Sequence, residues 1–261
     1  MRKKCAAESS SMHKEKRDIL ILYAKAIGYV LIAYAAMAIG YLPVIIGQAT
    51  DAVALMQETL EIGAYKPVIV TAPSISSGLF YTYRLQNSHA KRNTPLIEIL
   101  KSCLQSGVVA VLGFNIYWGM LMGVLPIMQV NPVEQFSGAP HSSIYLCNSI
   151  IPCTAFHSFL LLIVGIFSSV IFMSSFCSNH HIGISYTFTI LVYQIIAYTE
   201  SIMRIPRKYM IDSISSGWFR IGMDTPLLDM LWAIVVISAH TVPFALFILC
   251  IRNKCENQIS E

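Results

Sequence analysis

A run of 65 residues without a single Lys, Arg, Asp or Glu, from Gln135 to Thr199, is the strongest constraint on how this chain folds. A soluble core cannot be built from so long an uncharged segment. As one helix the run would measure about 100 Å, roughly three times the thickness of the hydrocarbon layer of a bilayer. It must therefore fold back on itself in a membrane, and the polar stretch from Cys177 to His181 is the predicted turn.

Six stretches have the length and apolar composition of membrane spans. They cover residues 19–46, 67–83, 102–128, 150–176, 182–198 and 230–251. The second stretch is the weakest, because it is short and holds several Thr, Pro, Ser and Gly residues. We expect an all-α polytopic membrane protein with six transmembrane helices in a single transmembrane domain over residues 1–261. A basic interfacial segment, residues 1–18, precedes the first span.

The distribution of Lys and Arg predicts which side each loop faces, because these residues favour cytoplasmic loops close to the spans. With six spans and the N-terminus inside, twelve of them lie on the inner side and five on the outer side, while Lys25 falls within the first span. If residues 67–83 did not cross, the count would become ten against seven. Six spans with a cytoplasmic N-terminus and a cytoplasmic C-terminus are therefore favoured.

Composition leaves little room for anything besides the membrane domain. Apolar residues make up 55% of the chain and charged residues 12%. The net charge of +4 arises in the inner loops, so it indicates contact with the lipid bilayer and its anionic headgroups, and not with nucleic acid. Seven Cys without a C-x-x-C pair predict no metal or redox framework. The basic N-terminus is similar to a secretion signal, but its apolar stretch runs on to Ile46, which favours an uncleaved span.

Ionisable residues within the spans are the first candidates for function, because burying them in a membrane is costly. Lys25 lies close to the inner end of its span and can extend to the interface, which is favoured over a role in a pathway. His157 and His240 lie deeper, where a neutral imidazole hydrogen-bonded to a neighbouring helix is favoured over a proton relay or a ligand. His180 and His181 are expected in a solvated turn, since no Asp or Glu joins them to complete a metal site.

Motifs of membrane enzymes and of ATPases are incomplete or absent. Glu200 to Arg204 reads E-x-x-x-R and Phe176 to His180 reads F-x-x-x-H, fragments that resemble intramembrane metalloproteases of the prenyl-protein-processing type. Their order is reversed and the acidic fragment has one Glu, so we predict that Glu200 and Arg204 form an i,i+4 helix pair at the outer interface. No G-x-x-x-x-G-K-[ST] phosphate loop is present, so we expect no catalytic residues, metal site or cofactor on this chain.

The stretch from Arg84 to Lys101 is the only substantial inner loop of the predicted topology. Within it Thr94 can cap a helix whose first residue is Pro95. As a docking surface for an ATP-binding partner the loop would offer seven residues: Arg84, Lys91, Arg92, Thr94, Pro95, Glu98 and Lys101. A stop-transfer loop held by anionic lipid explains the same charges, and both interpretations stay open.

Several features of the layout occur together. The first span ends in Tyr41 to Pro43, and a Ser-rich second span runs into Tyr83 and a basic loop. A polar turn precedes an apolar run from Ser178 to Tyr193, and a long outer segment from Glu200 to Asp229 precedes the last span. This layout resembles the six-span permease subunits of bacterial ABC-type exporters, in particular small uncharacterised permeases of Gram-positive bacteria.

The resemblance implies a permease in the bacterial cell membrane that forms the translocation path with a second copy or a related permease. Separate ABC-type ATP-binding subunits would then supply the energy. Close helix packing is expected at the small-residue patterns from Gly119 to Gly123 and from Ala24 to Gly28. Two other functions stay open: an accessory or immunity-type membrane protein without transport activity, and an intramembrane enzyme.

Overall fold

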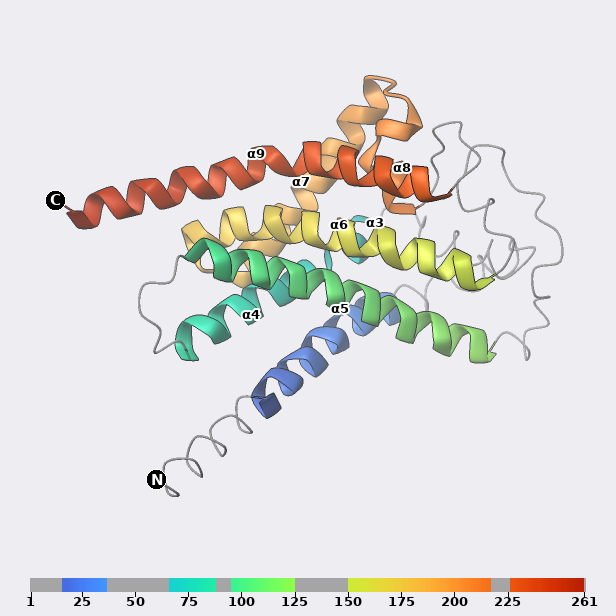
Figure 1. Ribbon diagram of the computed structural model, residues 1–261, viewed down its shortest axis with the longest axis horizontal. Coiled ribbons are helices and arrows are strands. Elements are labelled where there is room, and N and C mark those ends of the chain that lie inside the picture. Colours follow the sequence, from blue (N-terminus) through green and yellow to red (C-terminus); the bar gives the residue numbers. More distant parts are fainter. Residues whose placement is uncertain (1–15, 37–65, 88–94, 125–149, 217–225, 261) are drawn as a thin grey trace.

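The computed structural model describes residues 16–36, 66–87, 95–124, 150–216 and 226–260, which are helical almost throughout and contain no β-strand. The elements are a first helix Lys16–Ala36, α3 Lys66–Thr71, α4 Ser74–Asn87, α5 Pro95–Val124, α6 Ile150–Asn179, α7 Ile182–Ile202, the 3-10 helix η3 Arg207–Tyr209, α8 Ile211–Ser216 and α9 Pro226–Ser260 (Figure 1). The predicted all-helical fold is therefore confirmed for the described residues.

Five of the helices are long and apolar enough to cross a membrane. The crossing segments are Lys16–Ala36, Leu96–Leu121, Thr154–Asn179, Ile182–Ile202 and Leu227–Ile251. They coincide with five of the six predicted spans, and residues 37–46 of the first predicted span lie outside the described part of the chain. The chain is thus a multi-pass membrane protein by the length and composition of its helices.

The predicted second span, residues 67–83, is broken into α3 and α4 at Ala72 and Pro73. Pro73 lacks a backbone N–H and so cannot continue the hydrogen-bond ladder of α3. Its carbonyl oxygen accepts hydrogen bonds from the hydroxyl of Ser76, at 2.6 Å, and from the hydroxyl of Ser106 on α5. Side chains of α4 and α5 thereby satisfy the backbone where the helix breaks.

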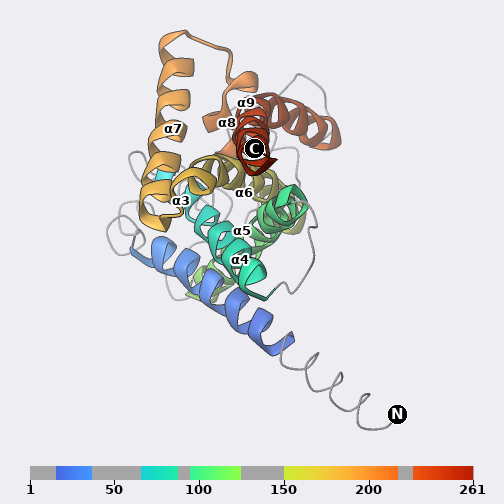
Figure 2. The ribbon, with the colours of Figure 1, turned by 90° about the vertical axis from the view of Figure 1, so that its left-hand side faces the viewer.

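α6 is the centre of the bundle, and α4, α5, α7 and α9 pack around it (Figures 1 and 2). α5 approaches α6 closely at Gly107 and Gly165: a Cβ on Gly165 would lie 3.2 Å from the Cα of Gly107. A Cβ on Gly107 would lie 2.9 Å from the carbonyl oxygen of Leu162. Only glycine allows the two backbones to come this near.

Within the described residues, the predicted close contacts at Gly119, Gly123 and Gly28 are not present. A Cβ on any of these glycines would meet no described atom within 4 Å. The close approach of α5 and α6 lies about three helical turns before Gly119, and the spacing pattern alone carries no information about which face of α5 meets a neighbour.

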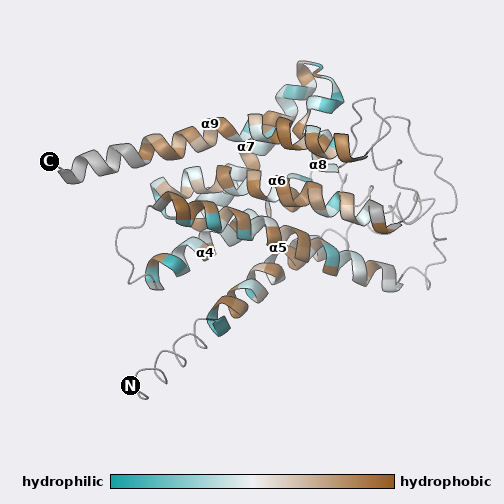
Figure 3. Cartoon of the chain, viewed as in Figure 1, coloured by the Kyte–Doolittle hydropathy of each residue, from teal (hydrophilic) through white to brown (hydrophobic). Residues whose placement is uncertain are grey.

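α7 is steeply inclined to α5, α6 and α9. Figure 1 shows those three helices running alongside one another. Figure 2 looks along them and shows α7 from the side, standing upright at the left. After α7 the chain returns through η3 and α8 to the start of α9. Figure 3 shows apolar residues along the long helices and polar residues between α7 and α8. The inclination of α7 therefore brings a polar segment against the N-terminal half of α9.

Candidate functional site

Seven polar side chains from four helices gather where α3, α7, α8 and α9 meet, and we call them the polar cluster. Its members are Lys66, Tyr193, Glu200, Asp212, Ser215, Ser216 and His240. Two acids, a lysine and a histidine in an apolar bundle carry a high desolvation cost, so such groups mark a functional site by default.

Lys66, the first residue of α3, ties that helix to α8. Its ammonium nitrogen lies 3.0 Å from the Oδ1 carboxylate oxygen of Asp212. It also donates to the backbone oxygen of Asp212 at 2.8 Å and to the hydroxyl of Ser216 at 3.2 Å. These contacts use all three N–H donors of the buried ammonium group. Lys66 is consequently held in one place and acts as the countercharge of Asp212.

Tyr193 connects α7 to the same residues. Its side chain is fully buried, and its hydroxyl oxygen lies 2.9 Å from the Ser215 hydroxyl. The Tyr193 hydroxyl also points toward the Asp212 carboxylate, with the oxygens 3.4 Å apart. α8 has only six residues and contacts α3 through Lys66 and α7 through Tyr193, so these side chains help to hold it in place.

Glu200, near the end of α7, uses both carboxylate oxygens. The Oε2 atom accepts a hydrogen bond from the backbone N–H of Ile211, the first residue of α8, at 2.9 Å. The Oε1 atom lies 2.9 Å from Nε2 of His240 on α9. The predicted i,i+4 pair of Glu200 with Arg204 is wrong, because α7 ends at Ile202 and Arg204 takes a left-handed backbone conformation with φ 52°.

His240 lies within α9 and has both ring nitrogens engaged. Nδ1 is 2.8 Å from the backbone oxygen of Val236, one helical turn earlier, and Nε2 contacts Glu200 of α7. The predicted hydrogen bond from this imidazole to a neighbouring helix is confirmed. His157 on α6 is buried beside the rings of Phe114 and Phe156, and its structural role stays a prediction.

The protease-like fragments of the sequence do not come together at the polar cluster. Both ring nitrogens of His240 are occupied by Val236 and Glu200. Phe176 and His180 precede α7 while Glu200 and Arg204 lie at or beyond its far end, so the two protease-like fragments are separated by about 30 Å of helix. The described residues hold no group of three His, Cys, Asp or Glu able to bind a metal.

Two polar cavities flank Asp212. The smaller, of about 350 Å³, is lined by Lys66, Tyr198 and Ser201 besides Asp212. The larger, of about 690 Å³, is lined by Arg204 and Arg207 and shares Ser201 and Asp212 with the smaller one. Both volumes are in the range of small-molecule sites. The polar cluster therefore borders on space that water or a small polar ligand can occupy.

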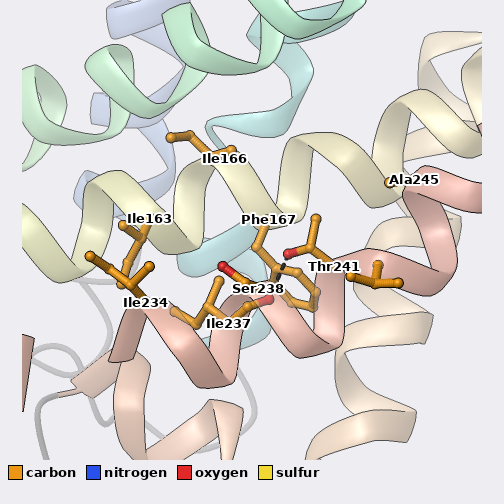
Figure 4. A pocket seen from close by; sticks show the side chains of 9 residues that line it. Ile163, Ile166, Phe167, Ile234, Ile237, Ser238, Thr241 and Ala245 are labelled. Carbon is orange, nitrogen blue, oxygen red and sulfur yellow. Dashed lines mark hydrogen bonds between the residues drawn. The ribbon is translucent and has the colours of Figure 1, made fainter. Parts of the chain in front are cut away.

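An apolar cleft of about 300 Å³ lies between α6 and α9 (Figure 4). Ile163 and Phe167 of α6 face Ile237 and other residues of α9 across it, and Ile166 also borders the cleft but points toward α5. The Phe167 ring also meets the His240 ring edge-on, with centroids 6.5 Å apart. Phe167 thus separates the apolar cleft from the imidazole.

At the opposite end of the bundle, α4 and α5 are joined by a second ionic network. Arg84 lies 2.7 Å from a carboxylate oxygen of Glu98 and donates to the Gln105 side chain at 2.7 Å. Lys101, whose side chain is half exposed, lies 3.0 Å from the other oxygen of Glu98. Of the predicted docking residues, Arg84, Glu98 and Lys101 are therefore brought together.

The rest of the predicted docking surface is only partly described. α5 begins at Pro95, as predicted. Lys91, Arg92 and Thr94 lie outside the described residues, so their part in docking stays a prediction. Lys25 is exposed on the first helix, and His180 and His181 are exposed at the turn between α6 and α7, where both were expected.

Sequence reasoning missed the pairing of Lys66 with Asp212 and of Glu200 with His240. The partners are 146 and 40 residues apart, and no spacing rule connects them. One signal was present: Glu200 ends the long uncharged run, and His240 is an ionisable residue inside the last span. Two ionisable groups that are costly to bury, in spans close to one another, are candidate hydrogen-bonding partners.

No protein-family model matches this chain, and neither a curated protein nor a solved structure matches it. The class of protein is therefore defined by fold and site alone: a helical multi-pass membrane protein with an ionisable cluster where four of its helices meet.

Proposed function

We propose that this chain is the membrane-spanning permease subunit of an ATP-driven transporter in the bacterial cell membrane, and that a separate subunit binds ATP. The broken helix α3–α4 carries the proposal, because discontinuous helices recur where a translocation path needs polar groups at membrane depth. Buried hydroxyls of α4, α5 and α6 surround the break: Ser74, Ser76, Ser77, Ser106 and Ser169. Ser169 and Ser106 are 2.6 Å apart, and Ser106 donates to the Pro73 carbonyl.

Contacts at the two ends of the bundle support six crossings with both termini cytoplasmic. Lys66 bonds to Asp212 at one end, and the distribution of Lys and Arg assigns both residues to the outer side. At the other end, Tyr81 of α4 packs in an apolar cluster with Phe176 and Ile248, which lie near the inner ends of α6 and α9. α3 and α4 together measure about 33 Å, which is enough to cross.

The inner end of α4 and α5 is the proposed docking site for the ATP-binding subunit. Glu98 of α5 forms ion pairs with Arg84 of α4 and with Lys101 of α5. The pair with Arg84 connects the two helices that flank the Lys91–Arg92 segment. A rigid hairpin can transmit the movement of a partner to the broken helix α3–α4, of which α4 is part. A second copy of this chain or a related permease would complete the path.

Charge reversal tests this docking site. Changing Lys91→Glu and Arg92→Glu together is expected to reduce co-purification with the ATP-binding subunit several-fold, because repulsion replaces attraction at the contact. The inner count of Lys and Arg falls only from twelve to ten, so insertion should be normal. The matched control is Arg207→Glu with Lys208→Glu, the same change on the proposed outer side, which should leave co-purification unchanged.

Two outcomes would contradict parts of this proposal. Equal recovery of the ATP-binding subunit with both double variants would remove the docking role of Lys91 and Arg92. If no ATP-binding subunit co-purifies with the wild-type chain, the permease function loses its support, and an accessory membrane protein without transport activity becomes the better hypothesis.

A further inference from the structure

We propose that Glu200 and His240 together form a binding site for one exchangeable proton, and that the bound proton fastens α7 and α8 to α9. The inference goes beyond the transport function and does not depend on it. It rests on the hydrogen-bonding partners of the two side chains.

The tautomer of His240 is fixed by its backbone contact. Nδ1 lies 2.8 Å from the carbonyl oxygen of Val236, and a carbonyl oxygen can only accept, so Nδ1 carries a hydrogen. The opposite nitrogen, Nε2, lies 2.9 Å from the Oε1 atom of Glu200. Without a hydrogen between them, both of these atoms are acceptors. The contact therefore requires one further proton, on Nε2 or on the carboxyl group.

Either position of that proton gives the pair no net charge. With the proton on Nε2 the contact is an imidazolium–carboxylate ion pair, and with the proton on Oε1 it is a carboxylic acid that donates to a neutral imidazole. Loss of the proton leaves a single negative charge on a carboxylate whose side chain is 6% exposed. That state is costly, both because the charge is desolvated and because two lone pairs face each other.

The imidazole is the more accessible of the two groups, because the His240 side chain is 25% exposed, against 6% for Glu200. On α6, Phe167 packs against the imidazole and carries no charge. The charged residues at this end of the surrounding elements are Lys66 on α3, Arg204, Arg207 and Lys208 after α7, Asp212 on α8 and Asp229 on α9, and the tyrosines there are Tyr193 and Tyr198 on α7 and Tyr209 on η3. Asp212, directly after Ile211, already has Lys66 as its countercharge.

The bound proton is linked to the position of α8 through the second oxygen of Glu200. That oxygen accepts from the N–H of Ile211, where α8 begins. α9 also contacts this segment through Trp232, whose indole donates to the Lys208 backbone oxygen at 2.7 Å and packs against the Tyr209 ring. Trp232 and His240 are two helical turns apart on α9. Loss of the proton would release the contact between Glu200 and His240 and loosen the start of α8.

Glu200→Gln is the matched variant for this site. A glutamine amide can donate from its nitrogen to Nε2 of neutral His240 and accept from Ile211 with its oxygen. It therefore keeps both hydrogen bonds and removes the exchangeable proton. His240→Gln, in contrast, removes the titrating ring and identifies the His240 signal by its disappearance.

The experiment is a pH series of nitrogen NMR spectra on the full chain with ¹⁵N-labelled histidine, in lipid nanodiscs and without any ATP-binding subunit. The expected result is a single pH-dependent step in the Nε2 signal of His240, with Nδ1 protonated throughout. In Glu200→Gln that step should be displaced or lost, while the signals of the exposed His180 and His181 should be the same in both proteins.

Hydrogen exchange of the peptide that contains residues 206–216 provides the second measurement. After correction for the intrinsic pH dependence of exchange, protection in the wild type should fall across the same step as pH rises, and Glu200→Gln should show no such fall. An Nε2 step that is identical in wild type and Glu200→Gln would overturn the proton site, and a step without any change in protection would overturn its link to α8. Neither result bears on the permease proposal, because no partner is present.

Discussion

Lys66 and Asp212 form one ion pair, but the two residues differ in what their loss would cost. The Lys66 side chain is 7% exposed, whereas that of Asp212 is 39% exposed and can reach water. Asp212→Asn leaves a buried ammonium without a countercharge and is expected to destabilise the protein by about 3 kcal/mol, the low end of the range for a broken buried pair. Lys66→Met leaves only a hydrated carboxylate and should cost about 1 kcal/mol.

Chemical unfolding in detergent, with both variants measured against the wild type, checks this order. An equal loss for the two variants would mean that Lys66 is hydrated in solution and that the pair is no more than a surface contact. Lys66→Arg is a useful third variant, because it keeps the positive charge and changes only the shape of the group that contacts Asp212 and Ser216.

At the residue scale, the sequence predicted which groups need hydrogen-bonding partners better than it predicted which residues those partners are. The hydrogen-bonded state of His240 was predictable, since an imidazole inside a span must find a partner. Its partner was not, because Glu200 was assigned to Arg204 on helical spacing. The spacing rule holds only while the helix continues, and α7 ends at Ile202, two residues before Arg204. Local rules therefore failed where the chain leaves a helix.

At the element scale, Gly107 and Gly119 on α5 provide a matched pair of substitutions. Gly107→Ala places a Cβ 2.9 Å from the Leu162 carbonyl oxygen and 2.8 Å from the Ile166 side chain, and a backbone atom cannot move aside. We expect a loss of about 1–3 kcal/mol from overpacking. Gly119→Ala meets nothing within 4 Å and should gain up to about 1 kcal/mol of helix propensity. Thermal unfolding of the two variants in the same detergent measures the contrast, and similar stabilities would contradict the packing of α5 on α6.

At the end of α7, in contrast, introducing a glycine is predicted to raise the stability of the protein. Ile205 N–H bonds to the Glu200 carbonyl at 3.0 Å and Arg204 N–H to the Ser201 carbonyl at 3.1 Å, a helix-ending motif in which glycine usually takes the left-handed position. Arg204 occupies that position with φ 52°. Arg204→Gly should therefore stabilise the protein by about 0.5–1 kcal/mol. Arg204→Ala is the control, because it removes the guanidinium but keeps the Cβ, and it should give no gain.

Helix existence was predictable and helix continuity was not. Long uncharged runs indicated five of the helices, because span length and apolar composition are the signal. The second span was also expected, but its break at Pro73 depends on hydroxyls that donate to the Pro73 carbonyl oxygen. One of these hydroxyls, that of Ser106, comes from another helix. The inclination of α7 likewise follows from contacts with α3, α8 and α9 that no periodicity encodes.

At the scale of the whole molecule, the bundle has a different kind of polar network at each end. The proposed inner end holds Arg84, Glu98 and Lys101, which are close in sequence and were anticipated together. The proposed outer end joins Lys66 to Asp212, from opposite halves of the chain, and Glu200 to His240, which are 40 residues apart. Charge distribution predicted the side of each loop but could not predict which loops meet, because that depends on how the spans are arranged.

The proposed topology places the two polar networks on opposite sides of the membrane. Single cysteines in a background without native thiols test this placement. Glu58→Cys, before α3, should be modified by an impermeant thiol reagent added outside, and Ser88→Cys, after α4, should be spared until the membrane is permeabilised. The physical reason is that α3 and α4 connect Lys66, which pairs with Asp212 at the proposed outer end, to Arg84, which pairs with Glu98 at the proposed inner end. If α3 and α4 did not cross, positions 58 and 88 would lie on the same side and show the same accessibility. That result would leave five crossings and place the N-terminus and C-terminus on opposite sides of the membrane.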